Sequence, residues 1–268
     1  MTLLMSQSHS RPATVARSSA SSLTLSAALG EQLSRLYEVA QRSDYVFGTP
    51  VGPFNHDGRQ HYLPRFVYFG PHTSEESPRL AFLAGGEARD LRPTLALLHL
   101  IEELATAPDL GQSLHVAFFP LVDVLGLQRA VPERRLADES WVQPASPEID
   151  QLAREARVGH FHGFVRLESA ADDAITLLVR TTSQSLPESL LFSSEDFEPE
   201  QVRWEIQFAP RFASGPLSLA EDLPFAPLDL TLRVPAAWSP DRYRRVVATI
   251  LKRFAVRYRA FLAYGQHL

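Results

Sequence analysis

The 268-residue sequence contains no cysteine, and Lys252 is its only lysine. Without cysteine the chain can form neither disulfides nor thiolate metal sites, and it carries no signal of its redox compartment. With a single lysine, almost all of the 26 lysine and arginine residues are arginine. We attribute this bias to the base composition of the genome rather than to function.

Long basic runs and long apolar runs are also missing. The formal net charge is −5, and nucleic-acid binding needs clustered positive charge, so we expect no nucleic-acid partner. No apolar stretch approaches the ~20 residues of a membrane span, so we expect no membrane contact. The first residues are rich in serine and lack the apolar core of an export signal. We therefore expect 1–25 to be a disordered tail and 26–268 to form one soluble, cytoplasmic domain.

What the sequence does contain is an alternation of helical and strand-like patterns. Apolar residues at helical spacing predict helices over 26–42, 94–105, 147–157 and 240–263. Short apolar or alternating runs predict strands within 61–70, 78–86, 113–123, 160–169, 202–210 and 228–235. The stretch 50–60 is interpreted as a loop, 175–182 as either a strand or a helix start, and 172–227 as an insertion. Strands that alternate with helices indicate an α/β sheet covered on both faces.

A charged cluster follows one of these predicted strands. In LAFLAGGEARDLRP, Leu80–Pro93, the apolar run ends in two glycines, and Glu87 and Asp90 come next, before a helical pattern. Two candidate ligands three residues apart after a strand form the layout of a metallohydrolase loop. Zinc sites of this shape begin with histidine, however, and glutamate stands here. The stretch is therefore a metal site, a site that has lost its metal, or an ordinary loop.

The order of the motifs resembles the zinc carboxypeptidase superfamily, especially its succinylglutamate desuccinylase and aspartoacylase branch. In that family an Ala-Gly-x turn leads to His-Gly-x-Glu, and here Ala84-Gly85-Gly86 leads to Glu87 and Asp90. The family's Pro-x-x-Asn-Pro-x-Gly corresponds to Pro120 through Gly126, with Asp123 in place of asparagine.

Two further motifs complete the resemblance, which runs from about Tyr62 to Leu262. The strand that ends in Glu168-Ser169 matches the family's strand that ends in a ligand histidine followed by serine. Arg233, just before Val234-Pro235, occupies the position of the family's catalytic glutamate. The resemblance implies a single-domain α/β/α sandwich with a mixed, mostly parallel sheet, and zinc as the cofactor of the family.

Every chemical residue departs from that pattern. Glu87, Asp90 and Glu168 stand where zinc needs His, Glu and His, and three carboxylates suit magnesium, manganese or calcium better than zinc. Arg233 would repel a divalent cation and cannot accept a proton. We therefore expect no bound metal, and we hypothesise that Arg233 takes the place of the metal and pairs with two of the three acids. The alternative is that these are four unrelated surface charges.

These substitutions lead us to interpret the chain as an inactive relative of zinc carboxypeptidases and N-acyl amino acid amidohydrolases. It would act as a binding or regulatory module for a small carboxylate-bearing molecule or peptide. The resemblance implies that arginines grip the substrate carboxylate, and the candidates are Arg89, Arg92, Arg129, Arg134 and Arg135. The alternative is an active metallohydrolase that cleaves a peptide or N-acyl amide bond with a metal held by carboxylates.

Overall fold

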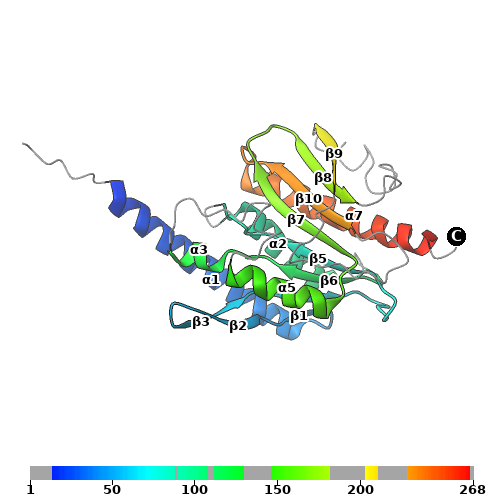
Figure 1. Ribbon diagram of the computed structural model, residues 1–268, viewed down its shortest axis with the longest axis horizontal. Coiled ribbons are helices and arrows are strands. Elements are labelled where there is room, and N and C mark those ends of the chain that lie inside the picture. Colours follow the sequence, from blue (N-terminus) through cyan, green and yellow to red (C-terminus); the bar gives the residue numbers. More distant parts are fainter. Residues whose placement is uncertain are drawn as a thin grey trace, which may run out of the picture.

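The computed structural model describes residues 14–87, 90–107, 112–129, 146–181, 203–210 and 228–265. Within these residues an eight-stranded sheet runs through the molecule (Figure 1). Its strands, in spatial order, are β1 (Val46–Gly48), β4 (Phe66–Phe69), β6 (His115–Phe119), β5 (Arg79–Leu83), β7 (Gly163–Ala170), β10 (Leu228–Pro235), β8 (Ile175–Thr181) and β9 (Trp204–Pro210). The helices are α1 (Thr14–Arg42), α2 (Arg92–Thr106), α3 (Val124–Arg129), α5 (Pro147–Gly159) and α7 (Pro240–Gly265).

The sheet is mixed, with a parallel centre. β6, β5, β7 and β10 run parallel to one another. β4 is antiparallel to β6, and β8 is antiparallel to β10. The prediction of a mixed, mostly parallel sheet is therefore confirmed, and so are the predicted strands that became β5, β6, β7, β9 and β10.

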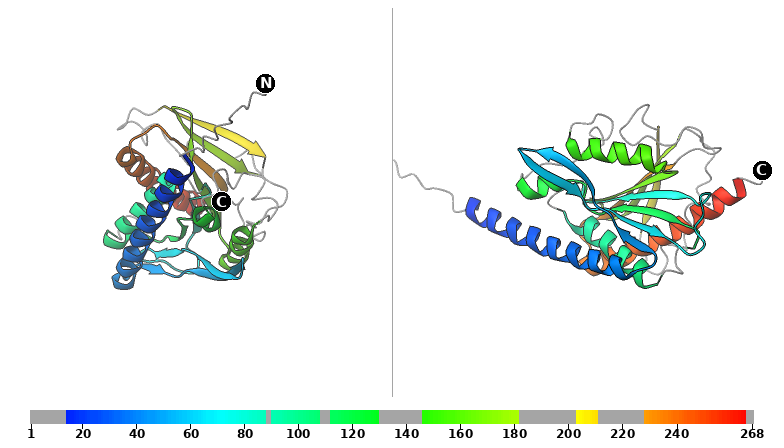
Figure 2. Two further views of the ribbon diagram at one scale, coloured as in Figure 1. Left: turned by 90° about the vertical axis from the view of Figure 1, so that its left-hand side faces the viewer. Right: turned by 90° about the horizontal axis from the view of Figure 1, so that it is seen from below.

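The connections place helices on both faces of the sheet. From β5 the chain passes through α2 to β6 on one side, and it then returns through α5 to β7 on the other side of β5. A right-handed connection between parallel strands places its helix on one face when the chain steps one way along the sheet and on the other face when it steps the other way. Figure 2 shows this arrangement, with α1, α2 and α7 below the sheet and α5 above it in the right-hand view. The predicted α/β/α sandwich is confirmed.

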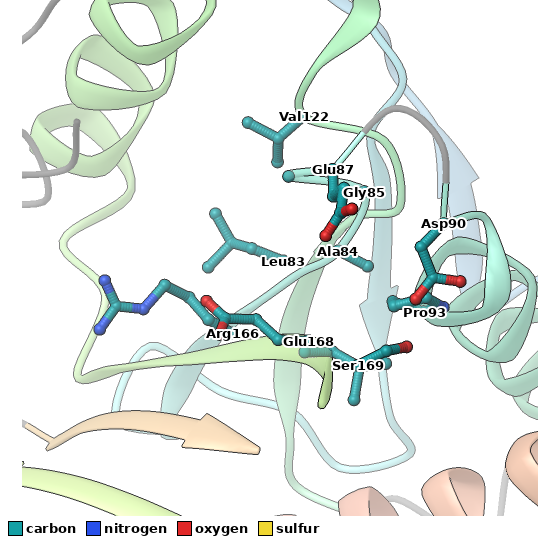
Figure 3. A pocket seen from close by; sticks show the side chains of 12 residues that line it. Leu83, Ala84, Gly85, Glu87, Asp90, Pro93, Val122, Arg166, Glu168 and Ser169 are labelled. Carbon is teal, nitrogen blue, oxygen red and sulfur yellow. The ribbon is translucent and has the colours of Figure 1, made fainter. Parts of the chain in front are cut away.

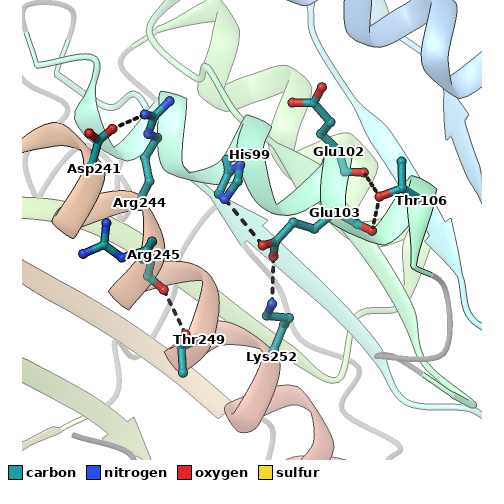
Figure 4. Close-up of polar contacts among 9 residues, drawn as sticks. All are labelled: His99, Glu102, Glu103, Thr106, Asp241, Arg244, Arg245, Thr249 and Lys252. Atoms are coloured by element: carbon teal, nitrogen blue, oxygen red, sulfur yellow. Dashed lines mark hydrogen bonds and ion pairs between the residues drawn. The ribbon is translucent and has the colours of Figure 1, made fainter. Parts of the chain in front are cut away.

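The core lies between the sheet and the α2–α7 layer. Phe82 of β5 packs edge-on against Phe118 of β6, with ring centroids 5.5 Å apart, and it also contacts Phe254 of α7. On the outer side the two helices are joined by Lys252, whose Nζ lies 2.7 Å from Glu103 Oε2 of α2 (Figure 4). The chain's only lysine therefore links α7 to α2.

The first helix is longer than the sequence predicted. Leu29 and Leu36 are buried against the core, as the amphipathic pattern over 26–42 indicated. The helix begins at Thr14, however, so part of the predicted tail 1–25 is helical, and 1–13 lie outside the described residues. Residues 14–25 contain neither glycine nor proline, so a helix already formed over 26–42 can extend through them.

The predicted loop over 50–60 is wrong, because the chain forms a hairpin there. β2 (Val51–His56) pairs antiparallel with β3 (Arg59–Leu63) in a separate two-stranded sheet. Asp57 and Gly58 both have positive φ, of 50° and 72°, the pattern of a two-residue type I′ turn. Pro64 follows β3 and separates it from β4, since proline cannot donate to a strand ladder. The predicted single strand over 61–70 is therefore two strands.

The predicted insertion over 172–227 contains two strands of the main sheet. β8 resolves the ambiguous stretch 175–182 as a strand, and β9 pairs with it in parallel. Residues 182–202 and 211–227 lie outside the described residues. In the part of the chain that the structure describes, no helix has the length and apolar character to cross a bilayer.

Candidate functional site

A pocket lies where the two crossovers diverge, at the carboxyl ends of β5 and β7. In open α/β sheets this switch in strand order leaves a crevice in which ligands bind. The pocket is lined by the end of β5, the loop that follows it, the start of α2 and the end of β7 (Figure 3). The lining residues are Leu83, Ala84, Gly85, Gly86, Glu87, Asp90, Pro93, Val122, Arg166, Leu167, Glu168 and Ser169.

Gly85 lets the chain leave β5 in this direction. Its φ is +67°, a backbone conformation that side chains disfavour. A Cβ there would also lie 2.7 Å from Thr94 Oγ1 and 2.9 Å from the Cα of Leu121. The Gly85 carbonyl accepts a 2.9 Å hydrogen bond from the amide of Asp123. The first predicted motif is therefore tied to the second by backbone contacts that only glycine permits.

The structure brings the three predicted acids to this one pocket. Glu87 lies on the loop after β5 and is exposed, whereas Asp90 precedes α2 and its side chain is 14% exposed. Glu168 lies near the end of β7, with its side chain 20% exposed. In Figure 3 their carboxylates surround the pocket from the loop, helix and strand sides.

Arg233 lies beside one of these acids. It is the register partner of Glu168 across β10 and β7, and its Nε lies 3.4 Å from Glu168 Oε2. Asp90 pairs instead with Arg92, through a 2.7 Å contact from Nε to Oδ1, and this hydrogen bond raises the pKa of Arg92. Glu87 forms no ion pair with the described residues. The hypothesis that Arg233 pairs with two of the acids is therefore wrong. Arg92 holds Asp90 because both lie in the same turn of chain.

Tyr243 supports the pocket from behind. This fully buried residue of α7 accepts a 3.2 Å hydrogen bond from Ser169 Oγ and donates to the carbonyl of Glu168 at 3.4 Å. Burial raises the pKa of its hydroxyl, so the group stays protonated and able to donate. Tyr243 thus fixes the end of β7, which carries Glu168. Its only sequence signal was an aromatic residue early in the last predicted helix.

A buried ion pair extends the site across the sheet. The guanidinium of Arg166, a residue only 3% exposed, lies 2.8 Å from Asp229 Oδ1 of β10. Arg166 also lines the pocket, two residues before Glu168. That spacing places both side chains on the same face of β7. Sequence reasoning missed this role of Arg166, although the i, i+2 spacing from Glu168 was its signal.

Of the five candidate ligand-binding arginines, only Arg92 has a described side chain, and it does not line the pocket but pairs with Asp90, which does. Arg92 begins α2, and its side chain is 31% exposed. Arg129 ends α3, but its side chain lies outside the description. Arg89, Arg134 and Arg135 lie outside the described residues. Their part in ligand binding stays a prediction.

The second motif is built around a buried aspartate. Asp123 is fully buried, and its Oδ1 accepts a 2.9 Å hydrogen bond from the amide of Gly126. A Cβ at Gly126 would lie 2.1 Å from the other carboxylate oxygen of Asp123, so only glycine fits there. The motif therefore needs glycine at position 126, because the carboxylate of Asp123 occupies the space of a side chain there.

The residues of the pocket do not fit zinc. Hydrolytic zinc takes three protein ligands, usually with imidazole among them, and here all three positions hold carboxylates. Two of these carboxylates are in ion pairs with Arg92 and Arg233. Across the described ranges, no three His, Cys, Asp or Glu side chains are placed to hold a metal ion.

Comparison with known proteins identifies the fold. No protein-family model matches the sequence, and no curated protein matches it either. Solved structures do match in three dimensions. A metallo-carboxypeptidase from Burkholderia cenocepacia superposes with a TM-score of 0.61 at 14% identity, over 85% of this chain and 68% of that one. The fold is that of the metallocarboxypeptidases.

Two more solved structures share the carboxypeptidase fold. A metallo-carboxypeptidase from Pseudomonas aeruginosa, in complex with (2-guanidinoethylmercapto)succinic acid, has a TM-score of 0.55 at 18% identity, over 83% of this chain and 67% of that one. An aspartoacylase family protein from Mesorhizobium loti has a TM-score of 0.52 at 15% identity, covering 78% and 66%. The resemblance drawn from the motifs is thus confirmed at the level of the carboxypeptidase fold.

Proposed function

We propose that this protein is a non-hydrolytic protein of the carboxypeptidase fold that binds a small carboxylate-bearing molecule or peptide at the pocket between β5 and β7. One observation carries the proposal. The positions that would supply ligands and base hold three carboxylates and an arginine, and two of the carboxylates are engaged by arginines.

The chemistry of these side chains supports the loss of hydrolysis. A guanidinium stays protonated at any ordinary pH, so Arg233 cannot take a proton from water. A carboxylate that already accepts from an arginine must give up that pair before it can bind a cation. Asp90 and Glu168 would each lose such a partner, and a metal would then lie beside two displaced positive charges.

Two features support a carboxylate-bearing ligand. The amino-terminal end of α2 reaches the pocket through Asp90 and Pro93, and the positive end of a helix dipole favours anions. The Pseudomonas aeruginosa structure holds a ligand that is a substituted succinic acid. Arg92 and the arginines outside the described residues are the candidate partners of the ligand's carboxylate.

The test measures binding and turnover with the same preparation. Calorimetric titration with (2-guanidinoethylmercapto)succinic acid should show saturable binding, and panels of peptides and N-acyl amino acids with added zinc, manganese or cobalt should show no hydrolysis. Absence of binding would contradict the proposal that the pocket binds a carboxylate-bearing ligand. Metal-dependent turnover would contradict the proposal that the protein is non-hydrolytic.

The alternative is a metallohydrolase whose metal is held by carboxylates. It is favoured by the convergence of Glu87, Asp90 and Glu168 on one pocket, since oxygen donors suit manganese or magnesium. Under this alternative, manganese-dependent amide hydrolysis would appear in the parent and disappear in Glu87→Gln, because Glu87 is the acid without an arginine partner among the described residues.

A further inference from the structure

A second cavity lies outside the candidate site, where α1, α3 and the β2–β3 hairpin meet. α3 contacts both α1 and β3, and these elements lie at the same end of the molecule (Figure 1). The space between them has a volume of about 290 Å³ and is open to solvent. We name this space the apolar cavity. Each of the three elements supplies one of its walls.

The first wall is one face of α1. Leu29, Leu33 and Tyr37 line the cavity at intervals of four residues, which places them one above another along the helix. Gly30 lines it beside them and is exposed, and a Cβ added there would have nothing within 4 Å. Glycine inside a helix is less favourable than alanine, and no close contact requires it at this position. Its effect is to leave the cavity open along α1.

The second wall is formed by α3 and the residues just before it. Leu121, Val124 and Leu127 line the cavity at intervals of three residues, so they share one side of this short helix. Leu121 and Val124 are buried, whereas Leu127 is only partly buried. The adjacent residue Val122 lines the candidate site instead. The apolar cavity and the candidate site are therefore separate spaces that share the link between β6 and α3.

The third wall belongs to the hairpin. Pro50 precedes β2, Tyr62 lies in β3 and Pro64 follows β3. Proline has no N–H group, so two of these three residues offer no backbone donor to a molecule in the cavity. The large side chain of Tyr62 is 47% exposed, so this wall reaches the protein surface. A molecule can therefore enter the cavity from solvent beside Tyr62.

The chemistry of the walls decides which molecule can bind. Among the described lining residues none carries a charge, and the hydroxyls of Tyr37 and Tyr62 are the only polar side-chain groups. Burial raises the pKa of Tyr37 to about 12, so its hydroxyl stays neutral as well. Water needs about two to four polar partners to be held in a cavity, whereas an apolar molecule needs none. A charged group would lose its hydration here without gaining a partner.

The dimensions of the cavity decide the size of that molecule. An apolar cavity of about 150 Å³ holds benzene, so a volume of about 290 Å³ accommodates a group about twice as large. The α1 wall from Leu29 to Tyr37 extends roughly 12 Å along the helix axis. The space is therefore elongated, and its length and volume suit an alkyl chain of about ten carbons.

We propose that the apolar cavity binds the alkyl chain of a small, uncharged, lipid-like molecule. The chain would lie along α1 between the leucines of α1 and α3, with its polar end at the opening beside Tyr62. Burial of its methylene groups against aliphatic walls supplies the affinity, because these walls form no ion pairs that the ligand must displace. This site does not depend on the proposed carboxylate-bearing ligand, which would occupy the other pocket.

The experiment uses N-phenyl-1-naphthylamine, a neutral dye whose fluorescence rises in apolar surroundings. The parent protein should bind it saturably, with a dissociation constant on the order of 10 µM. 1-Decanol should displace the dye, and 1-octanol and 1-hexanol should do so progressively less well. The loss should be about fourfold for each methylene group removed. Equal potency of the three alcohols would contradict burial of an alkyl chain.

Gly30→Phe tests the location of the site, because the added ring would enter the open space beside Leu29 and Leu33. Affinity for the dye and for 1-decanol should fall about tenfold, and the melting temperature should not fall, since phenylalanine is a better helix former than glycine. Leu33→Gln, which places an amide in the same half-buried wall, should also weaken both. Ala28→Phe is the matched control, because Ala28 is exposed on α1 and does not line the cavity. It should leave both affinities unchanged.

Two results would overturn the inference. Failure of the dye and all three alcohols to bind would mean that the chain itself or a macromolecular partner covers the cavity. Equal effects of Gly30→Phe and Ala28→Phe would mean that the dye binds elsewhere. Titration of the parent and Gly30→Phe with (2-guanidinoethylmercapto)succinic acid keeps the two proposals apart, since the proposed function predicts equal binding of this acid to both proteins.

Discussion

Arg233 and Glu168 face each other in register on β10 and β7, and their side chains form an ion pair at 3.4 Å. At the two positions where the motif resemblance implies a base and a ligand histidine, the chain holds a salt bridge. The Arg233 side chain is 31% exposed, so water screens this pair. The pair therefore changes the chemistry of the site more than the stability of the fold.

Arg233→Ala should accordingly cost little stability. Partly exposed ion pairs contribute about 1 kcal/mol or less, so the free energy of unfolding should fall by no more than that. Urea unfolding of parent and variant gives the value. A loss of several kcal/mol would show that Arg233 neutralises a buried acid.

Arg166→Met should cost much more, because it leaves Asp229 at 14% exposure without the guanidinium 2.8 Å away. Removing one partner of a buried pair costs about 3 kcal/mol or more. The double variant Arg166→Met/Asp229→Leu should recover much of the loss, since the buried carboxylate is removed together with the guanidinium. The same unfolding experiment applies, and a double variant less stable than Arg166→Met would contradict the assignment.

Gly85→Ala tests the turn that shapes the pocket. Alanine at this position would have to adopt the positive φ, and its Cβ would lie 2.7 Å from Thr94 Oγ1 and 2.9 Å from the Cα of Leu121. We therefore expect the free energy of unfolding to fall by about 2 kcal/mol or more. Gly58→Ala is the control, because Gly58 has a φ of +72° but nothing within 4 Å of an added Cβ. It should lose only about 1 kcal/mol. Equal losses of stability in the two variants would mean that the close contacts at Gly85 do not contribute to the destabilisation.

Two histidines at the opposite end of the sheet should make stability depend on pH. Burial lowers the pKa of His115 and of His162 from 6.5 to about 4, and Arg79 adds to the shift at both. For His115 the charges of His162 and Arg65 lower the pKa further. His162 Nδ1 also accepts a 3.2 Å hydrogen bond from the amide of Arg79, which requires the neutral ring.

The unfolded chain therefore binds protons to these histidines more readily than the folded chain does. Their contribution to stability is complete above pH 6.5 and is lost as the pH falls from about 6.5 to about 4. Melting temperatures measured across that range should decline, and the decline should be shallower in His115→Gln/His162→Gln. Parallel curves for parent and double variant would contradict the placement of the two rings.

Much of the fold could be predicted because its sequence patterns are physically unambiguous. The run from Leu80 to Leu83 is apolar without alternation, as a central strand covered on both faces requires. The hairpin over 51–63 was missed because its glycine, proline and asparagine are typical of loops. The dipeptide Asp57-Gly58 was the one signal of a hairpin in this stretch. It indicates a tight turn, but it does not indicate that the residues on either side pair as strands.

The site could be predicted in part for a similar reason. Carboxyl ends of parallel strands meet at one edge of a sheet, so motifs after β5 and at the end of β7 had to lie near each other. Which arginine pairs with which acid depends on local geometry that no motif contains. Arg92 reaches Asp90 from two residues away, and Arg166 reaches Asp229 across the sheet.

Calorimetric titration of zinc into the parent and into Glu87→His/Glu168→His/Arg233→Glu tests the central claim most directly. If arginines and carboxylates have replaced the metal site, the parent should show no stoichiometric binding, and the triple variant, which restores imidazole ligands and removes the guanidinium, should bind zinc more tightly. One tightly bound zinc per chain in the parent, lost in Glu87→Gln, would contradict the account.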